Sequence, residues 1–322
     1  MNIEVLDCTL RDGGYVNDWN FGYDNIQKII NNLILSKIQF IECGFLKKNL
    51  FNRDFSLFNS FEALNEFPNN SKLGLMLNFG EFDEKELLEL NPYNFFLRIA
   101  FKKEDFSGAM SLCEVLIKNG FKIFINPMNT ISYNDIELLN LIEFANKIKP
   151  FVLTIVDTMG QMNKKETLLM FYLFDKNLNS DIAIGYHSHN ALALSFSNVQ
   201  CLLEQKSDRS LIIDSTLFGM GRGAGNLSSE LLIQYLNDNY EKDFDSIPIL
   251  KSIQESINSI FDKSPWGYSI PYRIAALNSC HPNYAKLLIE KKVDIEIIDK
   301  ILKKIPEEKK ASFDKKILEN IM

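Results

Sequence analysis

Two of the chain's three histidines, His187 and His189, lie two residues apart in an apolar stretch of strand-like sequence. In a β-strand this spacing places both imidazoles on one face, where they can bind the same ion. Imidazole pairs suit Mn²⁺, Zn²⁺, Fe²⁺ or Co²⁺ when a carboxylate joins them. A short strand pattern near the N-terminus ends at Asp7 and supplies that carboxylate. These three residues predict a metal site with open positions for substrate and water.

A glycine-rich segment at residues 219–226 reads Gly-Met-Gly-Arg-Gly-Ala-Gly-Asn and precedes a helical pattern. Alternating glycines expose backbone N–H groups and a helix start attracts anions, so Gly221, Arg222 and Gly223 can cradle a carboxylate or a phosphate of the substrate. A tight turn that needs positive φ angles is the alternative explanation of the glycines. Asn226 can turn its amide oxygen to the metal as a fourth protein ligand.

The elements that must position these residues are eight apolar runs of strand length, separated by amphipathic stretches. The runs cover residues 3–8, 40–45, 72–79, 95–101, 122–127, 151–158, 183–190 and 211–219. Helical spacing of apolar residues covers 24–37, 107–119, 134–149 and 164–177. Eight apolar strands that alternate with helices predict a closed (β/α)₈ TIM barrel. A doubly wound open sheet is the alternative, but the usual glycine-rich turn after its first strand is absent.

The alternation stops after Tyr240. Beyond it no strand pattern remains, and helical periodicity covers residues 249–261, 283–291 and 295–305. We therefore expect a TIM-barrel catalytic domain at residues 1–243 and a C-terminal helical domain at residues 244–322.

Polar residues gather near the carboxyl ends of the predicted strands, where barrel enzymes carry out their chemistry. They are Asp7, Glu42, Arg98, Asp157, Thr158, His187, His189 and Asp214. Buried polar groups need partners, so this gathering favours a shared site, with Arg98, Asp157 and Thr158 as substrate-binding candidates. An ion pair between Arg98 and Asp157 is the structural alternative. Strand alternation predicts that Cys8 and Cys43 face the opposite side and serve in packing.

Composition limits the classes of partner. The formal charge is −7 and the pI is near 5.2, which argues against a nucleic-acid or anionic-membrane surface. No apolar run reaches the roughly 18 residues of a membrane span, and the start lacks the pattern of a signal peptide. The five cysteines are scattered without metal-ligand spacing. We expect a cytoplasmic globular protein.

Four motifs together resemble a known family. Asp-Cys-Thr-Leu-Arg-Asp-Gly at 7–13, Glu42, His-Ser-His-Asn at 187–190 and Gly-Arg-Gly-Ala-Gly-Asn at 221–226 look like the metallolyase barrels of the hydroxymethylglutaryl-CoA lyase superfamily. The phrase Leu-Arg-Ile-Ala at 97–100 and Asn190 look most like its 4-hydroxy-2-oxovalerate aldolase branch. The likeness covers residues 3 to 235.

The resemblance implies a divalent metal, commonly Mn²⁺ or Mg²⁺, held by Asp7, His187 and His189, with Co²⁺ or Zn²⁺ also compatible. It further implies a 2-keto acid such as pyruvate that chelates the metal, with Arg11 steadying the enolate oxygen and Glu42 as a further catalytic residue. The chemistry agrees, because making or breaking a C–C bond beside a carbonyl passes through an enolate whose charge needs a Lewis acid and a fixed cation.

One departure from the family concerns the proton carrier. The aldolase branch has histidines in the loop after Arg-Asp-Gly, whereas residues 13–19 here have none. Tyr15 in this loop, or Tyr268 and Tyr272 from the C-terminal region, can take the role if a nearby cation lowers a phenol pKa, and a metal-bound water is another route. The aromatic cluster at 264–272 is either a lid over the barrel mouth or a packing patch. His281 is expected to be structural.

The favoured function is a metal-dependent aldolase that joins or splits a 2-keto acid and an aldehyde. A Claisen-type acyl-CoA condensing enzyme is an alternative, although Gly13, Gly14 and Asn190 differ from its usual motifs. An amidohydrolase would place the His-x-His pair on its first strand and needs further histidines. A non-catalytic barrel kept as a binding or scaffold subunit is the remaining alternative. Barrel helices and the helical region offer surface for a homodimer or for a partner enzyme that receives the aldehyde.

Overall fold

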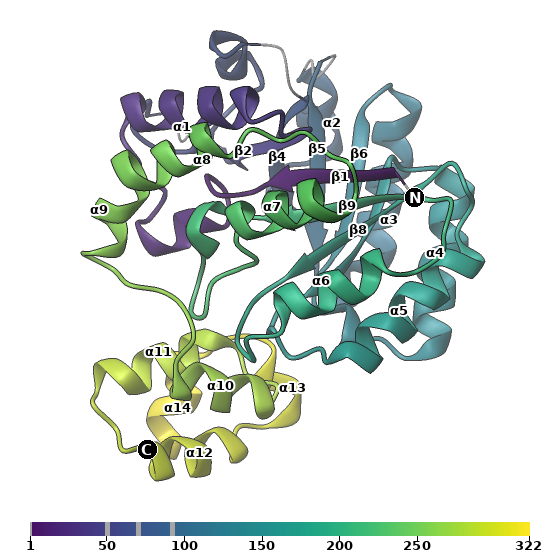
Figure 1. Cartoon of the computed structure of the whole chain (residues 1–322). Helices are drawn as coiled ribbons and strands as arrows, with labels where there is room; N and C mark the ends of the chain where they lie inside the picture. Colours follow the sequence, from purple (N-terminus) through teal and green to yellow (C-terminus); the bar gives the residue numbers. More distant parts are fainter. Residues whose placement is uncertain (1, 49–51, 69–71, 91–93) are drawn as a thin grey trace.

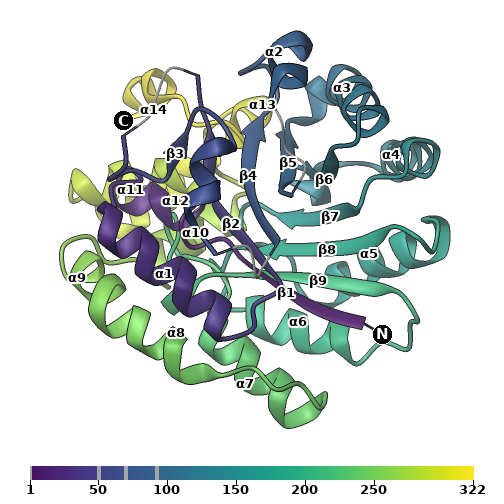
Figure 2. The same cartoon turned by 90° about the horizontal axis from the view of Figure 1, so that it is seen from above.

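The structure, a computed structural model, describes residues 2–48, 52–68, 72–90 and 94–322. In these residues eight parallel strands close into a barrel (Figure 1, Figure 2). The strands are β1 (Asn2–Asp7), β2 (Phe40–Leu46), β4 (Lys72–Asn78), β5 (Phe96–Phe101), β6 (Lys122–Pro127), β7 (Val152–Asp157), β8 (Ala183–Ser188) and β9 (Ser210–Ser215). Their order is β1-β9-β8-β7-β6-β5-β4-β2, and pairing of β1 with β2 closes the circle. The predicted TIM barrel is confirmed.

Helices follow the strands and cover the outside of the barrel (Figure 2). They are α1 (Tyr23–Leu35), α2 (Glu84–Glu89), α3 (Phe106–Lys118), α4 (Asp135–Ile148), α5 (Lys164–Asn177), α6 (Ser195–Leu203) and α7 (Ser229–Asn239). Local sequence fixes several helix starts. The Asn134 side chain accepts from Glu137 N–H and the Glu137 side chain accepts from Asn134 N–H, a reciprocal cap that satisfies two backbone donors. Asn163 and Glu166 repeat the arrangement at α5.

The interior of the barrel is filled at its amino-terminal end by one layer of apolar side chains. The layer comprises Leu6, Cys8, Phe40, Phe96, Phe124, Val152, Ala183 and Ile212. Because side chains alternate along a strand, Leu6 and Cys8 fix the facing of β1, and Asp7 between them points outward to the helices. By the same alternation Glu42, Arg98, His187 and Asp214 point inward, above the apolar layer.

The C-terminal region has two parts. Helix α8 (Ser246–Ser252), a π-helical turn (Ile253–Ile257) and α9 (Asn258–Phe261) follow one another, and α8 lies against α1 and α7. Ile249, Ile253 and Ile257 belong to the hydrophobic core of the barrel. The predicted domain boundary between residues 243 and 244 stays a prediction. Helix α8, which follows this boundary, packs on the barrel.

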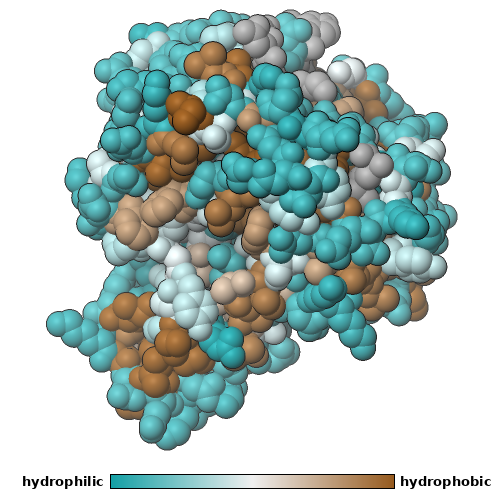
Figure 3. Space-filling model, viewed as in Figure 1, coloured by the Kyte–Doolittle hydropathy of each residue, from teal (hydrophilic) through white to brown (hydrophobic). Residues whose placement is uncertain are grey.

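The remaining helices form the C-terminal helical unit, which lies below the barrel in Figure 1. They are α10 (Ile270–Leu277), α11 (Pro282–Glu290), α12 (Ile295–Lys303), α13 (Glu307–Lys310) and α14 (Lys315–Ile321). The unit has its own hydrophobic cluster, which includes Tyr284, Leu288 and Leu302. In Figure 3 most of the visible surface is hydrophilic, and hydrophobic residues also gather on this unit. None of the helices in the described ranges is long and apolar enough to cross a membrane.

Candidate metal centre and catalytic site

The two histidines of β8 and the loop after it lie together with Asp12. All three residues are buried, and their possible ligand atoms lie within 4.8 Å of one another. The imidazole rings of His187 and His189 are 5.3 Å apart between centroids and nearly perpendicular, at 88°. The predicted pairing of the histidines on one face is therefore what the structure shows.

Hydrogen bonds fix the tautomer of each histidine. Nδ1 of His187 lies 2.9 Å from Asp214 Oδ2, and Nδ1 of His189 lies 3.2 Å from the carbonyl oxygen of Gly225. A carbonyl only accepts, and an ionised carboxylate only accepts, so we assign the proton of both rings to Nδ1. Burial lowers the pKa of His189 to about 3, so its ring is neutral. Both Nε2 lone pairs are then free, which is the arrangement of metal-binding histidines.

The carboxylate at this site is Asp12, and the prediction for Asp7 is corrected. Asp7 points out of the barrel, where its Oδ1 accepts from Thr9 N–H at 2.9 Å and its Oδ2 accepts from Ser229 Oγ at 2.8 Å. The chain turns sharply after β1, because the N–H groups of Arg11 and Asp12 both donate to the carbonyl of Cys8. This turn brings Asp12 back over the barrel interior, and its Oδ2 lies 3.7 Å from His189 Nε2.

Asn226 completes the set of possible ligands. Its amide nitrogen donates to Asp12 Oδ2 at 2.5 Å and to the carbonyl of Met220 at 3.0 Å. Its Oδ1 is buried and has no hydrogen-bond partner among the described residues. A buried amide oxygen without a partner costs free energy, and a cation removes that cost. Two open imidazole nitrogens, one carboxylate and one open amide oxygen therefore fit a divalent metal.

A chain of buried charges joins Asp12 to His187 behind the metal centre. Arg11 donates from Nη1 to Asp12 Oδ1 at 2.7 Å and from Nε to Glu42 Oε2 at 2.6 Å. Glu42 Oε1 lies 3.5 Å from Nε of Arg98. Arg98 in turn donates to both oxygens of Asp214, at 2.6 and 2.9 Å. Arg98 is thus paired with Asp214 and Glu42 rather than with Asp157.

The electrostatics of this chain favour a divalent ion together with a monoanionic ligand. Burial alone raises the pKa of Asp214, but the charge of Arg98 and the hydrogen bond from His187 outweigh it and lower that pKa to about 2. Burial likewise opposes ionisation of Asp12, yet the positive charge of Arg11 holds its pKa well below its usual value. Three carboxylates against two guanidinium groups leave a net charge of −1. Binding of a divalent cation changes the sign of this net charge, and one carboxylate group of a bound substrate then neutralises the site.

Asp157 lies outside this constellation, and its assignment to substrate binding is corrected. Its two oxygens accept from the backbone N–H groups of Gln161 and Met162, each at 2.9 Å, so it caps the loop after β7. Burial raises its pKa to about 6. Thr158 accepts from Asn129 N–H at 2.8 Å and lines a small cavity that also touches His189.

Tyr15 lies at the mouth of the barrel, in the short helical turn Gly13–Val16. Its ring is 4.8 Å from that of Trp19 and 4.8 Å from the guanidinium carbon of Arg222. Burial raises the pKa of Tyr15 although Arg222 opposes the shift, so the hydroxyl stays protonated at neutral pH. The expected lowering of a phenol pKa by a cation is therefore not found.

The other two tyrosines differ in placement. Tyr272 lines cavities beside Arg222, and burial raises its pKa. Tyr268 is 51 % exposed and lines none of the cavities found near the metal centre. His281 accepts from Asn283 N–H through Nδ1 and caps α11, which agrees with a structural role.

The glycine-rich loop lies between the metal centre and the C-terminal helical unit. A Cβ on Gly221 would meet the amide nitrogen of Asn226 at 2.2 Å, so only glycine fits beside this ligand. Gly225 has φ +72° and approaches the Gly219 carbonyl, where a Cβ would come within 2.1 Å. The loop therefore owes its glycines to close approach and positive φ, and it places Asn226 by doing so.

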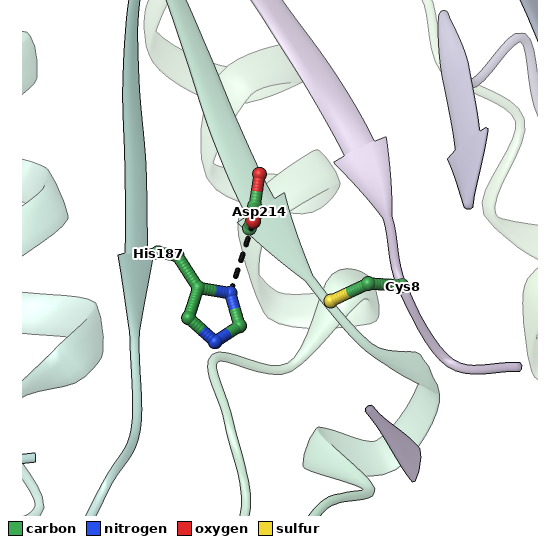
Figure 4. Close-up of side chains that lie close together, drawn as sticks. All are labelled: Cys8, His187 and Asp214. Atoms are coloured by element: carbon green, nitrogen blue, oxygen red, sulfur yellow. Dashed lines mark hydrogen bonds and ion pairs between the residues drawn. The ribbon is translucent and has the colours of Figure 1, made fainter. Parts of the chain in front are cut away.

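Sequence reasoning missed Cys8 as an inward-facing residue. Its Sγ lies within 4.8 Å of His187 and Asp214, at the end of β1 (Figure 4). Burial raises the pKa of the Cys8 thiol well above its usual value, so it stays a neutral thiol. The nitrogen of His187 on this side already donates to Asp214, so Cys8 belongs to the wall of the site rather than to the metal set.

The fold and the site together define a class of protein, a (β/α)₈ barrel with a buried candidate metal centre at the carboxyl ends of its strands. The HMGL-like family model matches residues 103–251. This match confirms the resemblance expected from the motifs.

Among curated proteins, the chain is similar to an oxaloacetate decarboxylase of Mycobacterium tuberculosis, with 25 % identity over 281 residues that cover 84 % of this chain and 80 % of the relative. It is also similar to a 4-hydroxy-2-oxovalerate aldolase of Geobacillus genomosp. 3, with 23 % identity over 268 residues, 81 % of this chain and 78 % of the relative. Among solved structures, the N-terminal domain of a putative aldolase from Bacteroides vulgatus superposes with a TM-score of 0.81 at 26 % identity and covers 92 % of this chain and 99 % of that chain. These relatives support a metallolyase or aldolase type of protein.

Proposed function

We propose that the protein is a divalent-metal-dependent carbon–carbon lyase that makes or breaks a bond between the enolate of a 2-keto acid and an aldehyde. The observation that carries the proposal is the convergence of two open Nε2 atoms, the Asp12 carboxylate and the unpartnered Oδ1 of Asn226 at the barrel mouth. Arg11 lies beside them and is the cation that enolate chemistry needs.

Asp12, His187, His189 and Asn226 would hold the metal, for which Mn²⁺ or Mg²⁺ is favoured by the oxygen ligands and Co²⁺ or Zn²⁺ is compatible with the imidazoles. When bound, a divalent ion supplies a Lewis acid that stabilises negative charge on a keto oxygen. Asp214 and the Gly225 carbonyl orient the two imidazoles for this task through their Nδ1–H groups.

Arg11 is held so that one donor stays free. Two of its nitrogens are engaged by Glu42 and Asp12, while its Nη2 is buried without a hydrogen-bond partner among the described residues. A guanidinium fixed on two sides does not reorganise when charge develops nearby, which makes its remaining N–H groups effective oxyanion donors. We assign Arg11 to the enolate oxygen and Glu42 to the positioning of Arg11.

We assign the role of proton donor to Tyr15, which lies at the mouth of the barrel. Its raised pKa keeps the hydroxyl protonated, so in bond formation it donates a hydrogen bond or a proton to the oxygen of the aldehyde. In bond cleavage the same phenol oxygen takes up the hydroxyl proton of the substrate. The stacked guanidinium of Arg222 and the edge of Trp19 fix the ring.

A second candidate activity is decarboxylation of a 2-keto diacid, favoured by the similarity to an oxaloacetate decarboxylase over 84 % of the chain. Loss of carbon dioxide from the carbon next to the keto group leaves the same enolate as aldol cleavage. The two activities then differ in the bond that breaks and not in the residues that stabilise the charge.

The test is the exchange of pyruvate methyl protons for deuterium in D₂O, followed by proton NMR. We expect exchange that depends on added Mn²⁺ or Mg²⁺ and that is lost in His187→Ala, while Lys291→Met, an exposed residue at the end of α11, serves as the control. Metal-independent exchange, or full exchange in His187→Ala, contradicts the proposal. Oxaloacetate in place of pyruvate tests the second activity by release of carbon dioxide.

A further inference from the structure

A second cavity, of about 400 Å³, opens between the barrel mouth and the C-terminal helical unit. Its lining includes Tyr15, Asp18, Arg222, Trp266, Tyr272 and Lys286. Its size falls in the usual range for small-molecule sites. Segments far apart in sequence thus build it: the turn after β1, the glycine-rich loop, the segment 264–266 before α10, and helices α10 and α11.

The charged groups of this cavity are mostly positive. Arg222 and Lys286 line it, and neither has an ion-pair partner among the described residues. The Nε atom of Arg222 is buried without a hydrogen-bond partner in the described part of the chain. The one acidic residue of the lining, Asp18, is exposed. Open cationic donors in a cavity of this kind favour an anionic ligand group.

The cavity adjoins the metal centre. Gly221, in its wall, lies directly against the amide of Asn226, and Arg222 also lines the small cavity that touches His189. Tyr15, the proposed proton donor, forms another part of the wall. A ligand in this cavity therefore lies beside Asn226 and Tyr15 and within reach of the cationic side chains of Arg222 and Lys286.

Two aromatic rings also line this cavity. Trp266 donates from Nε1 to the Phe218 carbonyl at 3.0 Å, which fixes its indole, and Tyr272 packs against Gly223. The walls thus combine aromatic rings with two cationic side chains. This combination suits a short carbon chain that ends in a negative group.

We propose that this cavity binds the aldehyde acceptor and that the acceptor carries a carboxylate or a phosphate, held by Arg222 and Lys286. The inference rests on the proposed lyase function and names the substrate class of that site. Lys286 becomes a specificity-determining residue supplied by the C-terminal helical unit.

The experiment compares acceptors matched in chain length in the metal-dependent aldol addition of pyruvate. Succinic semialdehyde is set against butanal, and glyceraldehyde 3-phosphate against glyceraldehyde. For the wild type we expect kcat/KM at least about tenfold higher for the charged member of one pair, since the hydrogen bond to a charged group is lost with the uncharged member. Lys286→Met should bring that ratio toward one, Arg222→Gln should do so more strongly, and Lys291→Met should keep the wild-type ratio.

The outcomes separate the two proposals. A preference confined to succinic semialdehyde identifies a carboxylate site, and one confined to glyceraldehyde 3-phosphate identifies a phosphate site. Metal-dependent pyruvate exchange without any preference for charge overturns the anion inference and leaves the lyase proposal standing.

If pyruvate exchange is absent, the lyase proposal fails, and the anion site is tested by binding alone. Glycerol 3-phosphate and succinate are then titrated while tryptophan fluorescence is followed, because Trp266 lines the cavity. Fluorescence quenching by either anion supports the anion site if the affinity for that anion falls at least tenfold in Lys286→Met. No response to either anion contradicts it.

Discussion

Asp7 and Asp12 are five residues apart, both are buried, and they lie in regions of opposite character. Asp7 is 1 % exposed on the outer face of β1, among neutral hydrogen-bond donors, and burial raises its pKa to about 6. Asp12 is 2 % exposed at the barrel mouth, and the cation Arg11 holds its pKa well below the usual value despite burial. Burial alone therefore makes a carboxyl reluctant to ionise, whereas fixed cations around it keep an anion ready for a metal.

The largest expected effect comes from the inner aspartate. Asp12→Asn should lower the rate of metal-dependent pyruvate exchange at least about 10³-fold, because losing the metal removes several kcal/mol of charge stabilisation. Asp7→Asn is the matched control, and its rate should stay within a few-fold of the wild type. A large loss of exchange rate in Asp7→Asn would contradict this comparison, provided that circular dichroism shows the variant to be folded.

The charge chain behind the inner aspartate should matter for folding. Arg98→Met leaves Glu42 and Asp214 buried without their shared cation, so the free energy of unfolding in urea should fall by about 3–5 kcal/mol. Lys103→Met removes a partly exposed ion pair with Glu137 and should cost less than about 1 kcal/mol. Equal losses in the two variants would show that the buried chain is not the stronger element.

The outer aspartate should be visible as a pH dependence of stability. Its pKa is higher in the folded state, about 6, than the usual 3.8, so the folded state binds more protons than the unfolded state between these values. Stability is then lost as the pH rises from about 4 to about 6, by at most about 3 kcal/mol. The difference in free energy of unfolding between wild type and Asp7→Asn should change in this window. The raised pKa of Asp157 is common to both proteins and cancels.

A smaller effect is expected where a residue only orients a metal ligand. Asp214→Asn keeps the shape of the partner of His187 Nδ1 but weakens the hydrogen bond, so Mn²⁺ affinity should fall about 10- to 100-fold. Calorimetric titration with Mn²⁺ measures the change. An unchanged affinity would mean that the His187 tautomer does not depend on Asp214.

The fold could be predicted from the sequence because eight apolar runs alternate with helical patterns, and both patterns are features of local periodicity. The histidine pair was accessible for the same reason, since a spacing of two in a strand fixes the facing. The carboxylate of the candidate metal site could not be predicted, because the sequence of residues 3–8 does not show which alternate side chains face the barrel interior. The apolar layer of Leu6 and Cys8, which decides the facing, depends on residues from β2 and from β5 to β9.

The ion-pair partners of the charged residues could not be predicted from the sequence either. Arg98 and Asp214 are 116 residues apart, and only closure of the barrel brings them together. Asp157 resembles a site residue by its position at a strand end, yet its oxygens are used by the backbone of the next loop. The Arg-Asp pair at 11–12 was the available signal for Asp12, because a turn directly after a strand reverses the chain over the barrel mouth.

The central claim is that Asp12, rather than Asp7, joins His187, His189 and Asn226 around one divalent ion. The most direct test is a titration of purified protein with Mn²⁺, with free Mn²⁺ measured by electron paramagnetic resonance. We predict one tight site per chain in the wild type and in Asp7→Asn, and loss of that site in Asp12→Asn. Retention of the site in Asp12→Asn together with its loss in Asp7→Asn would contradict the account.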